Sequence, residues 1–329
     1  MFNAPSSRRG FLQGAASLAA CSMAFPAGAQ NRFPWKPITL VVPFAPGGNV
    51  DIVARSLGVP LTKWVGQSVI VDNRAGGGGA VGTSTVARAE ADGHTLLVAT
   101  PGQLGTLPEI IKTPYKADSL VPVAVLSRTP VVVVVRANDP RFKTAADFIK
   151  AVKSTSQGVT VGHAGPGSPN HLALLQFEDS AQAQVNAVPY KGSGPALVDL
   201  MGGQIDAVID QITSSTPHIK GGALRALMVL GPQAGGLLAS VPTQVQLGLP
   251  VFDATTFVGV FAPKATPAAN VASLHEWITK SVAQPEFTNV IRDLGSEPVG
   301  EGGAALQRLV SGEVALATRM VKQGRLKAD

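Results

Sequence analysis

Ile38-Thr39-Leu40-Val41-Val42-Pro43-Phe44-Ala45-Pro46-Gly47-Gly48-Asn49 joins an apolar run to a glycine-rich loop. The unbroken apolar run 38–42 is typical of a buried parallel strand. Residues 49 to about 64 then have helical periodicity, with one apolar face formed by Ile52, Val53, Leu57 and Leu61. Pro60 falls inside this pattern, so we expect it to kink the helix or end it early. A strand, a loop and a helix in this order indicate an α/β fold.

The same alternation continues along the chain. We expect strands at 68–71 and 94–99, a glycine loop at 76–79 and a helix at 82–91. Strands that alternate with helices form βαβ units, which predict a parallel, doubly wound sheet.

A second α/β set follows two apolar runs at 121–126 and 131–135. We expect helices at 144–154, 169–179 and 194–201, and strands at 159–162, 187–190, 207–209 and 224–230. A strand at 255–261 leads back to three C-terminal helices at 270–283, 285–294 and 302–324. Two α/β halves joined by two crossings predict a two-lobed hinge protein. Lobe 1 would comprise residues 30–130 plus 256–329, and lobe 2 residues 131–255.

The first 29 residues have the character of an export signal. The segment from Ser7 to Gln13, which contains Arg8 and Arg9, resembles a twin-arginine signal. An apolar stretch follows at 11–25, and Ala27-Gly28-Ala29 offers the small residues of a cleavage site. We therefore expect cleavage after Ala29. The alternative is a lipobox that ends at Cys21, the single cysteine, and would make the protein a lipoprotein. No later stretch resembles a membrane-spanning helix.

The charge is mildly basic and evenly spread. Lys and Arg number 27 and Asp and Glu 21, a net charge of +6. Because the basic residues are not clustered and no aromatic residues interleave with them, the sequence lacks a nucleic-acid-binding footprint.

Motifs for cofactors and catalysis are incomplete. Residues 77–82 match G-x-G-x-x-G, but the next strand ends without the acidic residue that a dinucleotide site requires. Thr83 stands where a phosphate loop requires Lys. The His275-Glu276 pair lacks a second His four residues after the first, and the five His have no metal-ligand spacing. We expect surface or capping roles for these His, and no catalytic residue, metal or cofactor.

Two loops suit an anion. Residues 43–48 and 165–171 each precede a helix, where free N–H groups and the helix dipole favour negative charge. The glycines allow the backbone to approach a ligand closely. In the second loop Ser168 fits the N-cap and Pro169 fits the first helical position. The alternative is that both loops are ordinary turns that bind nothing.

Ordered motifs along the chain resemble one family. Residues 41–55 resemble the opening signature of the Bug-type receptors, the extracytoplasmic binding components of tripartite tricarboxylate transporters. The resemblance extends over essentially the whole chain after the export signal. The other matching blocks are 71–79, 92–97, 165–173, 188–192, 195–197, 202–206, 224–227 and 241–263.

The resemblance implies a fold, a function and a site. The fold would be a type II-like periplasmic binding protein, with the ligand in the cleft between the lobes. A periplasmic monomer of this kind would capture a small organic carboxylate for the membrane permease subunits, without a cofactor and without catalysis. The implied ligand-binding residues are Phe44, Ala45, Gly47, Gly48, Asn49, Thr100, Gly165, Gly167, Ser168, His171, Tyr190 and Asp210.

One loop departs from the family pattern. Residues 100–106 are apolar where relatives often carry Ser, Thr, His or Asn, so the partner of the ligand's far end stays open. Which carboxylate binds is open as well. Two other functions compete with transport. One is an exported enzyme that uses a cofactor, and the other is a sensor that reports to a membrane signalling protein.

Overall fold

The computed structural model describes residues 33–154 and 158–327. The expected export signal, Cys21 and the cleavage after Ala29 lie outside these residues. The chain divides into a first unit, Met1–Trp35, and a second, Lys36–Asp329. All elements named below belong to the second unit.

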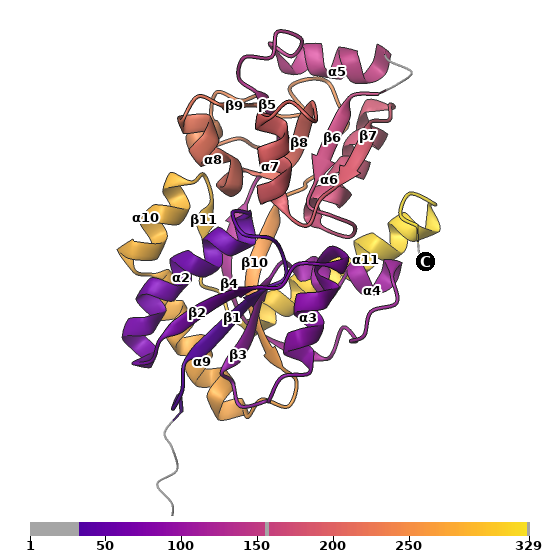
Figure 1. Ribbon diagram of the computed structural model, residues 1–329. Coiled ribbons are helices and arrows are strands. Elements are labelled where there is room, and N and C mark those ends of the chain that lie inside the picture. The colour runs from indigo at the N-terminus through magenta and orange to yellow at the C-terminus, as the bar shows by residue number, and fades with distance from the viewer. Residues whose placement is uncertain (1–32, 155–157, 328–329) are drawn as a thin grey trace, which may run out of the picture. The chain divides into compact units, whose positions relative to one another are not determined.

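Six strands form one sheet in the order β11-β4-β10-β3-β1-β2 (Figure 1). Its parallel part is built from β1 (Ile38–Val42), β2 (Val69–Asn73) and β3 (Thr95–Ala99). Its antiparallel part is built from β4 (Leu120–Thr129), β10 (Thr256–Pro263) and β11 (Glu297–Pro298). The helices that pack with this sheet are α2 (Asn49–Val65), α3 (Ala80–Ala87), α9 (Ala268–Val282), α10 (Pro285–Asp293) and α11 (Gly303–Lys322).

Five strands form the second sheet in the order β7-β6-β8-β5-β9. β6 (Thr160–His163), β7 (Asn186–Pro189) and β8 (Ala207–Gln211) are parallel. β5 (Val131–Arg136) is antiparallel to both β8 and β9 (Leu224–Val229). The accompanying helices are α5 (Ala145–Ser154), α6 (Pro169–Ala181), α7 (Ser193–Met201) and α8 (Ile212–Lys220). Shorter turns are η2 (Gly77–Gly79), η3 (Pro101–Gln103), α4 (Leu107–Ile110) and η4 (Gly236–Leu238).

The three strands predicted to be parallel, β1, β2 and β3, are parallel, but antiparallel strands complete both sheets, so the sheets are mixed. The chain leaves the first sheet at Thr129 and enters the second at Val131, with only Pro130 between them. Parallel strands need a crossover connection, usually a helix, and none lies between β4 and β5. β5 is accordingly antiparallel to its neighbours β8 and β9. β10 returns the chain to the first sheet, between β3 and β4.

Helix α2 contradicts the expectation that Pro60 would end it early. It continues past the proline to Val65 and ends at Gly66, which adopts a left-handed conformation with φ of 66°. Leu57, Leu61 and Val65 are buried on both sides of Pro60. Because most helical stability in proteins comes from packing an apolar face, this burial outweighs the lost backbone hydrogen bond.

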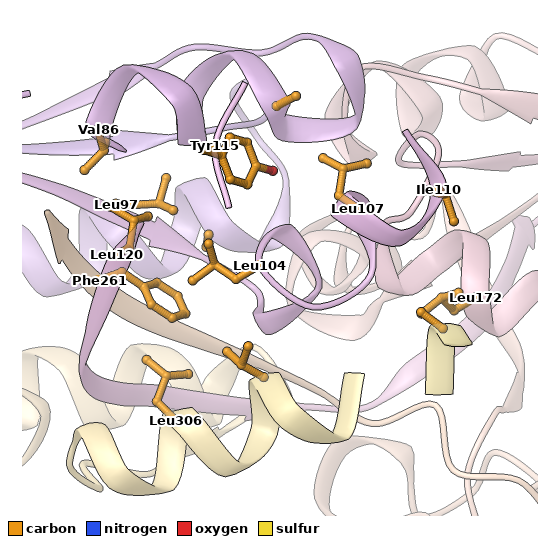
Figure 2. Close-up of a cluster of buried hydrophobic side chains, with 14 of the residues drawn as sticks. Val86, Leu97, Leu104, Leu107, Ile110, Tyr115, Leu120, Leu172, Phe261 and Leu306 are labelled. Carbon is orange, nitrogen blue, oxygen red and sulfur yellow. The ribbon is translucent and has the colours of Figure 1, made fainter. Parts of the chain in front are cut away.

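The cores follow strand periodicity. In β5, Val131, Val133 and Val135 join one apolar cluster, while Val132 and Val134 join another on the opposite face. The five-stranded sheet is therefore covered on both sides. In the first sheet, Leu97 and Phe261 pack with Leu306 of α11 (Figure 2). Leu172 of α6 belongs to the same cluster, so the elements of the two sheets share apolar contacts. Among the described residues, no helix is both long and apolar enough to cross a membrane.

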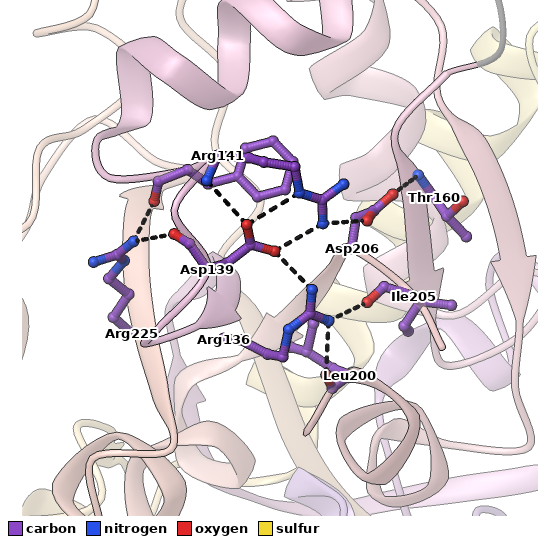
Figure 3. A network of polar contacts seen from close by, with 9 residues as sticks. Arg136, Asp139, Arg141, Thr160, Leu200, Ile205, Asp206 and Arg225 are labelled. Carbon is purple, nitrogen blue, oxygen red and sulfur yellow. Dashed lines mark hydrogen bonds and ion pairs between the residues drawn. The ribbon is translucent and has the colours of Figure 1, made fainter. Parts of the chain in front are cut away.

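The buried carboxylate of Asp139 is the centre of a hydrogen-bond network that links residues at the ends of β5, β6 and β8 (Figure 3). Asp139 is 4% exposed, and it accepts hydrogen bonds from Arg136 Nη2 at 2.6 Å and from Arg141 Nη2 at 2.7 Å. Arg141 also bonds to Asp206, which in turn accepts from the Thr160 amide. The hydrogen bonds from Arg141 hold the pKa of Asp139 down at about 2.

We predict that Asp139→Asn lowers the free energy of unfolding at pH 7 by about 2 kcal/mol, because two guanidinium groups lose their counter-charge. Since its folded pKa is depressed, the carboxylate stabilises the fold above its ordinary pKa of 3.8, and this contribution is lost as the pH falls towards about 2. Urea denaturation should therefore show the difference shrinking in acid. The matched control is Asp118→Asn, which breaks the exposed ion pair with Lys264 and should change little. Equal losses in the two variants would contradict a special role for Asp139.

Candidate functional site

A small cavity lies where the carboxyl ends of parallel strands from both sheets meet. It has a volume of about 20 Å³, which is the space of about one water molecule. The lining residues follow β1, β3, β6 and β7 in the chain, except for Gln211, which is the last residue of β8. In α/β proteins, ligands bind outside the carboxyl ends of the strands. We call this space the inner cavity, and its lining residues are Phe44, Gly48, Asn49, Val50, Thr100, Ala164, Ser168, Pro169, Asn170, Ser193 and Gln211.

Four helices begin at the inner cavity. Its lining contains the N-cap or first-turn residues of α2, α6, α7 and α8. Within the described chain, no side chain caps the start of α2, α7 or α8. The first N–H groups of a helix have no partner inside the helix, and the dipole makes this end positive. Their convergence gives the cavity a field that favours an anion.

Two buried asparagines line the inner cavity with unused polar atoms. Asn49 is 2% exposed, and within the described part of the chain neither its Nδ2 nor its Oδ1 has a hydrogen-bond partner. Asn170 is fully buried, and its Nδ2 donates to the Ile209 carbonyl at 2.8 Å. Its Oδ1 has no partner among the residues that the structure describes. Because a buried polar group that lacks a hydrogen-bond partner costs free energy, these atoms mark a site where a polar ligand atom would be stabilised.

The inner cavity is electrically neutral in its own side chains. None of its lining residues is Lys, Arg, Asp, Glu or His. Asp210 lies behind this lining, fully buried, where its Oδ2 accepts from Ser214 and Ser215. Burial raises the pKa of Asp210. Its hydrogen bonds anchor the first turn of α8, which has a Ser- and Thr-rich sequence of low helix propensity.

The loop after β1 is held by a carboxylate beneath it. Asp51 Oδ2 accepts from the Gly47 amide at 2.9 Å, and its Oδ1 accepts from Arg55 and Asn73. Asn73 also donates to the Phe44 carbonyl at 3.1 Å. This network fixes the loop without placing a charge in the cavity, and it explains the Asp51 and Arg55 positions in the 41–55 motif.

Two neutral histidines hold the loop after β6. The rings of His163 and His171 stack with their centroids 4.7 Å apart. His171 Nδ1 accepts from the Gly167 amide, while Ser168 Oγ donates to the Gly165 carbonyl at 2.7 Å. Burial lowers the pKa of His163 to about 3 and that of His171 to about 4. Both rings are therefore uncharged at neutral pH. His163 and His94 are buried, so a surface role is wrong for these two.

The loops of the two sheets touch each other through glycines. The Ala45 amide donates to the Lys191 carbonyl at 2.9 Å. A Cβ added at Gly194 would lie 2.2 Å from the Pro46 carbonyl oxygen, and one added at Gly78 would lie 2.4 Å from that of Pro166. At Gly48, by contrast, an added Cβ would meet Ser193 at an ordinary 3.5 Å. The close approach therefore depends on Gly194 and Gly78 rather than on Gly48.

A larger cavity adjoins the inner one. It measures about 290 Å³ and shares Phe44 and Ala164 with the inner cavity. The glycine turn 76–79 forms part of its wall, together with Ile111 and Tyr190. We call it the outer cavity.

The structure gathers many of the implied site residues. Phe44, Gly48, Asn49, Thr100 and Ser168 line the inner cavity. Phe44 also lines the outer cavity, together with Tyr190. The remaining residues, which line neither cavity but lie in the loops or behind them, are Ala45, Gly47, Gly165, Gly167, His171 and Asp210.

The implied ligand-binding residues leave out part of the inner lining, although two of these residues, Pro169 and Asn170, fall in the predicted anion loop 165–171. The residues left out are Val50, Ala164, Pro169, Asn170, Ser193 and Gln211. For Ser193 a signal was available, because it follows Gly192 at the start of a helix. Gln211 lacked one, because the helix that it precedes was not expected. In the described chain, no group of three His, Cys, Asp or Glu side chains has a geometry that could hold a metal ion.

Comparison with known proteins identifies the family. Residues 53–326 match the model of the tripartite tricarboxylate transporter family receptor. Among solved structures, the periplasmic binding protein BugD is 32% identical, with a TM-score of 0.85 over 90% of this chain and 100% of BugD. MatC from Rhodopseudomonas palustris with bound malate is 33% identical, with a TM-score of 0.81 over 87% of this chain and 99% of MatC.

A third structure, Rpa4515 from R. palustris with adipate, is 32% identical, with a TM-score of 0.85 over 90% of this chain and all of that protein. These matches confirm the resemblance seen in the sequence and the two-lobed periplasmic-binding-protein fold. This chain therefore belongs to the receptor family of the tripartite tricarboxylate transporters, a family of periplasmic solute-binding proteins.

Proposed function

We propose that this receptor captures a small organic acid by holding one carboxylate at the inner cavity, and that it delivers the acid to the membrane permease subunits. The observation that carries the proposal is the convergence of four helix N-termini on a cavity with unpartnered asparagine atoms. Malate and adipate in two structural neighbours are carboxylates of this class.

The strength of such a site can be judged from its parts. A partly buried helix N-terminus contributes up to about 2 kcal/mol to an anion. A hydrogen bond to a charged acceptor contributes about 1.5–3 kcal/mol. Micromolar affinity requires about 8 kcal/mol, so a few such contacts suffice without a salt bridge. Asn49 supplies the side-chain donor, and a water bound to Asn170 Oδ1 would supply another.

The lobes of this receptor would be residues 30–130 plus 256–329 and residues 131–255. This division follows the membership of the two sheets and puts the crossings at Pro130 and before β10. We propose that the lobes rotate about these crossings, so that the glycine contacts form when the acid is bound. The receptor would act as a periplasmic monomer after cleavage at Ala29, without enzymatic activity.

The first test compares an acid with its amide. A thermal-shift screen of organic acids should find one that stabilises the protein, by about 2.7 kcal/mol at a concentration 100-fold above Kd. The corresponding primary amide should give no shift, because the helix N-termini would face a neutral group with donors of its own. Equal thermal shifts for the acid and its amide would contradict the proposal that the carboxylate is the group that the receptor recognises.

Two variants show which group holds the acid. Asn49→Ala should weaken binding about tenfold or more, as expected for a lost hydrogen bond to a charged acceptor. Lys191→Ala, which removes a cation from the lining of the outer cavity, should weaken binding far less. If Lys191→Ala alone eliminated binding, a salt bridge would carry recognition instead.

The second test places an extra methyl group between the contacting loops of the two sheets. Gly194 has no positive φ and lies in the first turn of α7, so Gly194→Ala suits its own helix. The added Cβ would nevertheless collide with the Pro46 carbonyl. We expect an unchanged melting temperature without acid but no compaction with the best acid of the screen, as measured by small-angle scattering. The control Gly312→Ala has open space around it and should compact like the wild type. Normal compaction of Gly194→Ala would contradict closure through this contact.

The third test concerns export. If the twin-arginine pathway reads Arg8 and Arg9 as a pair, replacing both with Lys should leave the protein in the cytoplasm. Cell fractionation measures this outcome, and normal periplasmic recovery would contradict it. Mass spectrometry of the exported wild type should give Gln30 as the first residue. A lipidated Cys21 would support the lipobox alternative.

A further inference from the structure

The inner cavity holds only the head of an acid. Its 20 Å³ accommodates about one water-sized group, whereas any organic acid larger than formate also has a carbon body. The body must therefore lie in a neighbouring space. The outer cavity is the neighbour that shares two lining residues, Phe44 and Ala164, with the inner one. At about 290 Å³ it is nearly twice the size of a cavity of about 150 Å³ that is known to bind benzene.

The walls of the outer cavity are mainly apolar. Pro43, Phe44, Ile111, Pro166 and Pro189 contribute no side-chain hydrogen-bonding group. Among the described residues of the lining, Lys191 alone is charged, and its side chain is exposed. Within the described part of the chain, no carboxylate lines the cavity.

Three polar groups of the same walls already have partners. The Tyr190 hydroxyl donates to Asp199 Oδ2 at 2.7 Å, so Tyr190 has no free proton for a ligand. In the glycine turn, the Gly79 amide donates to the Gly76 carbonyl at 3.0 Å, and the Gly78 carbonyl accepts from Gln103 Nε2 at 3.4 Å. A second charged or strongly polar group on the ligand would gain no hydrogen bond from these three groups in exchange for its lost water.

From these observations we propose that the outer cavity takes an apolar body, so that the preferred ligand is a monocarboxylic acid with an alkyl chain or an aromatic ring. This inference rests on the proposed function and narrows its ligand class. It separates this receptor from the two structural neighbours that were solved with dicarboxylates.

The test is a calorimetric series on the purified full-length receptor with acetate, butyrate, hexanoate and phenylacetate, set against succinate, malate and adipate. Each buried methylene should tighten Kd about fourfold, so hexanoate should bind at least tenfold more tightly than acetate. Hexanoate should likewise bind at least tenfold more tightly than adipate, which has the same number of carbon atoms and a second carboxylate. Tighter binding of adipate than of hexanoate would overturn the inference.

Variants of Ile111 test whether the carbon body of the acid lies in the outer cavity. Ile111→Glu should weaken hexanoate tenfold or more while changing acetate less than twofold, because only the longer acid reaches the outer cavity. Ile111→Leu, the matched control, should bind hexanoate like the wild type. Lys191→Gln should also leave hexanoate binding unchanged, and it remains informative if Ile111→Glu does not fold. A tenfold loss of hexanoate binding in Lys191→Gln would show that the cation is used and would contradict an apolar site.

The result also distinguishes the two proposals. If none of these acids binds, nor any acid of a wider screen, the proposed function itself is wrong. If short dicarboxylates bind well while hexanoate and phenylacetate do not, the receptor function stands and only the apolar body is refuted.

Discussion

The first turns of four helices share one cavity with the space of about one water molecule, and this close convergence governs the rest of the molecule. It requires that the loops of the two sheets meet backbone to backbone, which is why Gly194 and Gly78 stand where a Cβ would strike a carbonyl. It also requires loops that keep their shape without a charge inside the cavity. Asp51 meets this need for the loop after β1, and the neutral pair His163 and His171 meets it for the loop after β6.

Recognition by helix ends and amides has a consequence for specificity. A neutral lining can bind one carboxylate without excluding many bodies attached to it, since the helix ends contact only the head. Specificity must then come from the space next to the head. In this receptor that space is bordered by Phe44, by Ile111 and by a glycine turn. Such walls favour ligands that bury apolar surface. One family fold can thus serve different acids by changing the walls of one cavity.

The sequence predicted local elements where periodicity was strong. The two α/β sets, the return strand near residue 256 and the three C-terminal helices all appear in the structure. Failures occurred where tertiary contacts override local signals. Pro60 does not end α2, because Leu61 and Val65 pack beyond it. Helix α8 was not expected, because its Ser, Thr and Pro residues favour other conformations and Asp210 stabilises its start. Gln211 is the residue before this unexpected helix, so spacing alone could not place it at the inner cavity. The loops 43–48 and 165–171, in contrast, were predicted from local sequence signals, and residues of both line the inner cavity.

The most direct measurement is a high-resolution crystal structure of the receptor with an acid bound. The account predicts one carboxylate at the inner cavity, with its oxygens about 2.7–3.1 Å from Asn49 Nδ2, from first-turn amides of the helices or from a water on Asn170. No Arg or Lys side chain would lie within salt-bridge distance of it. A carboxylate paired with Lys191 or another cation, with the inner cavity filled by water alone, would contradict capture by helix ends and amides.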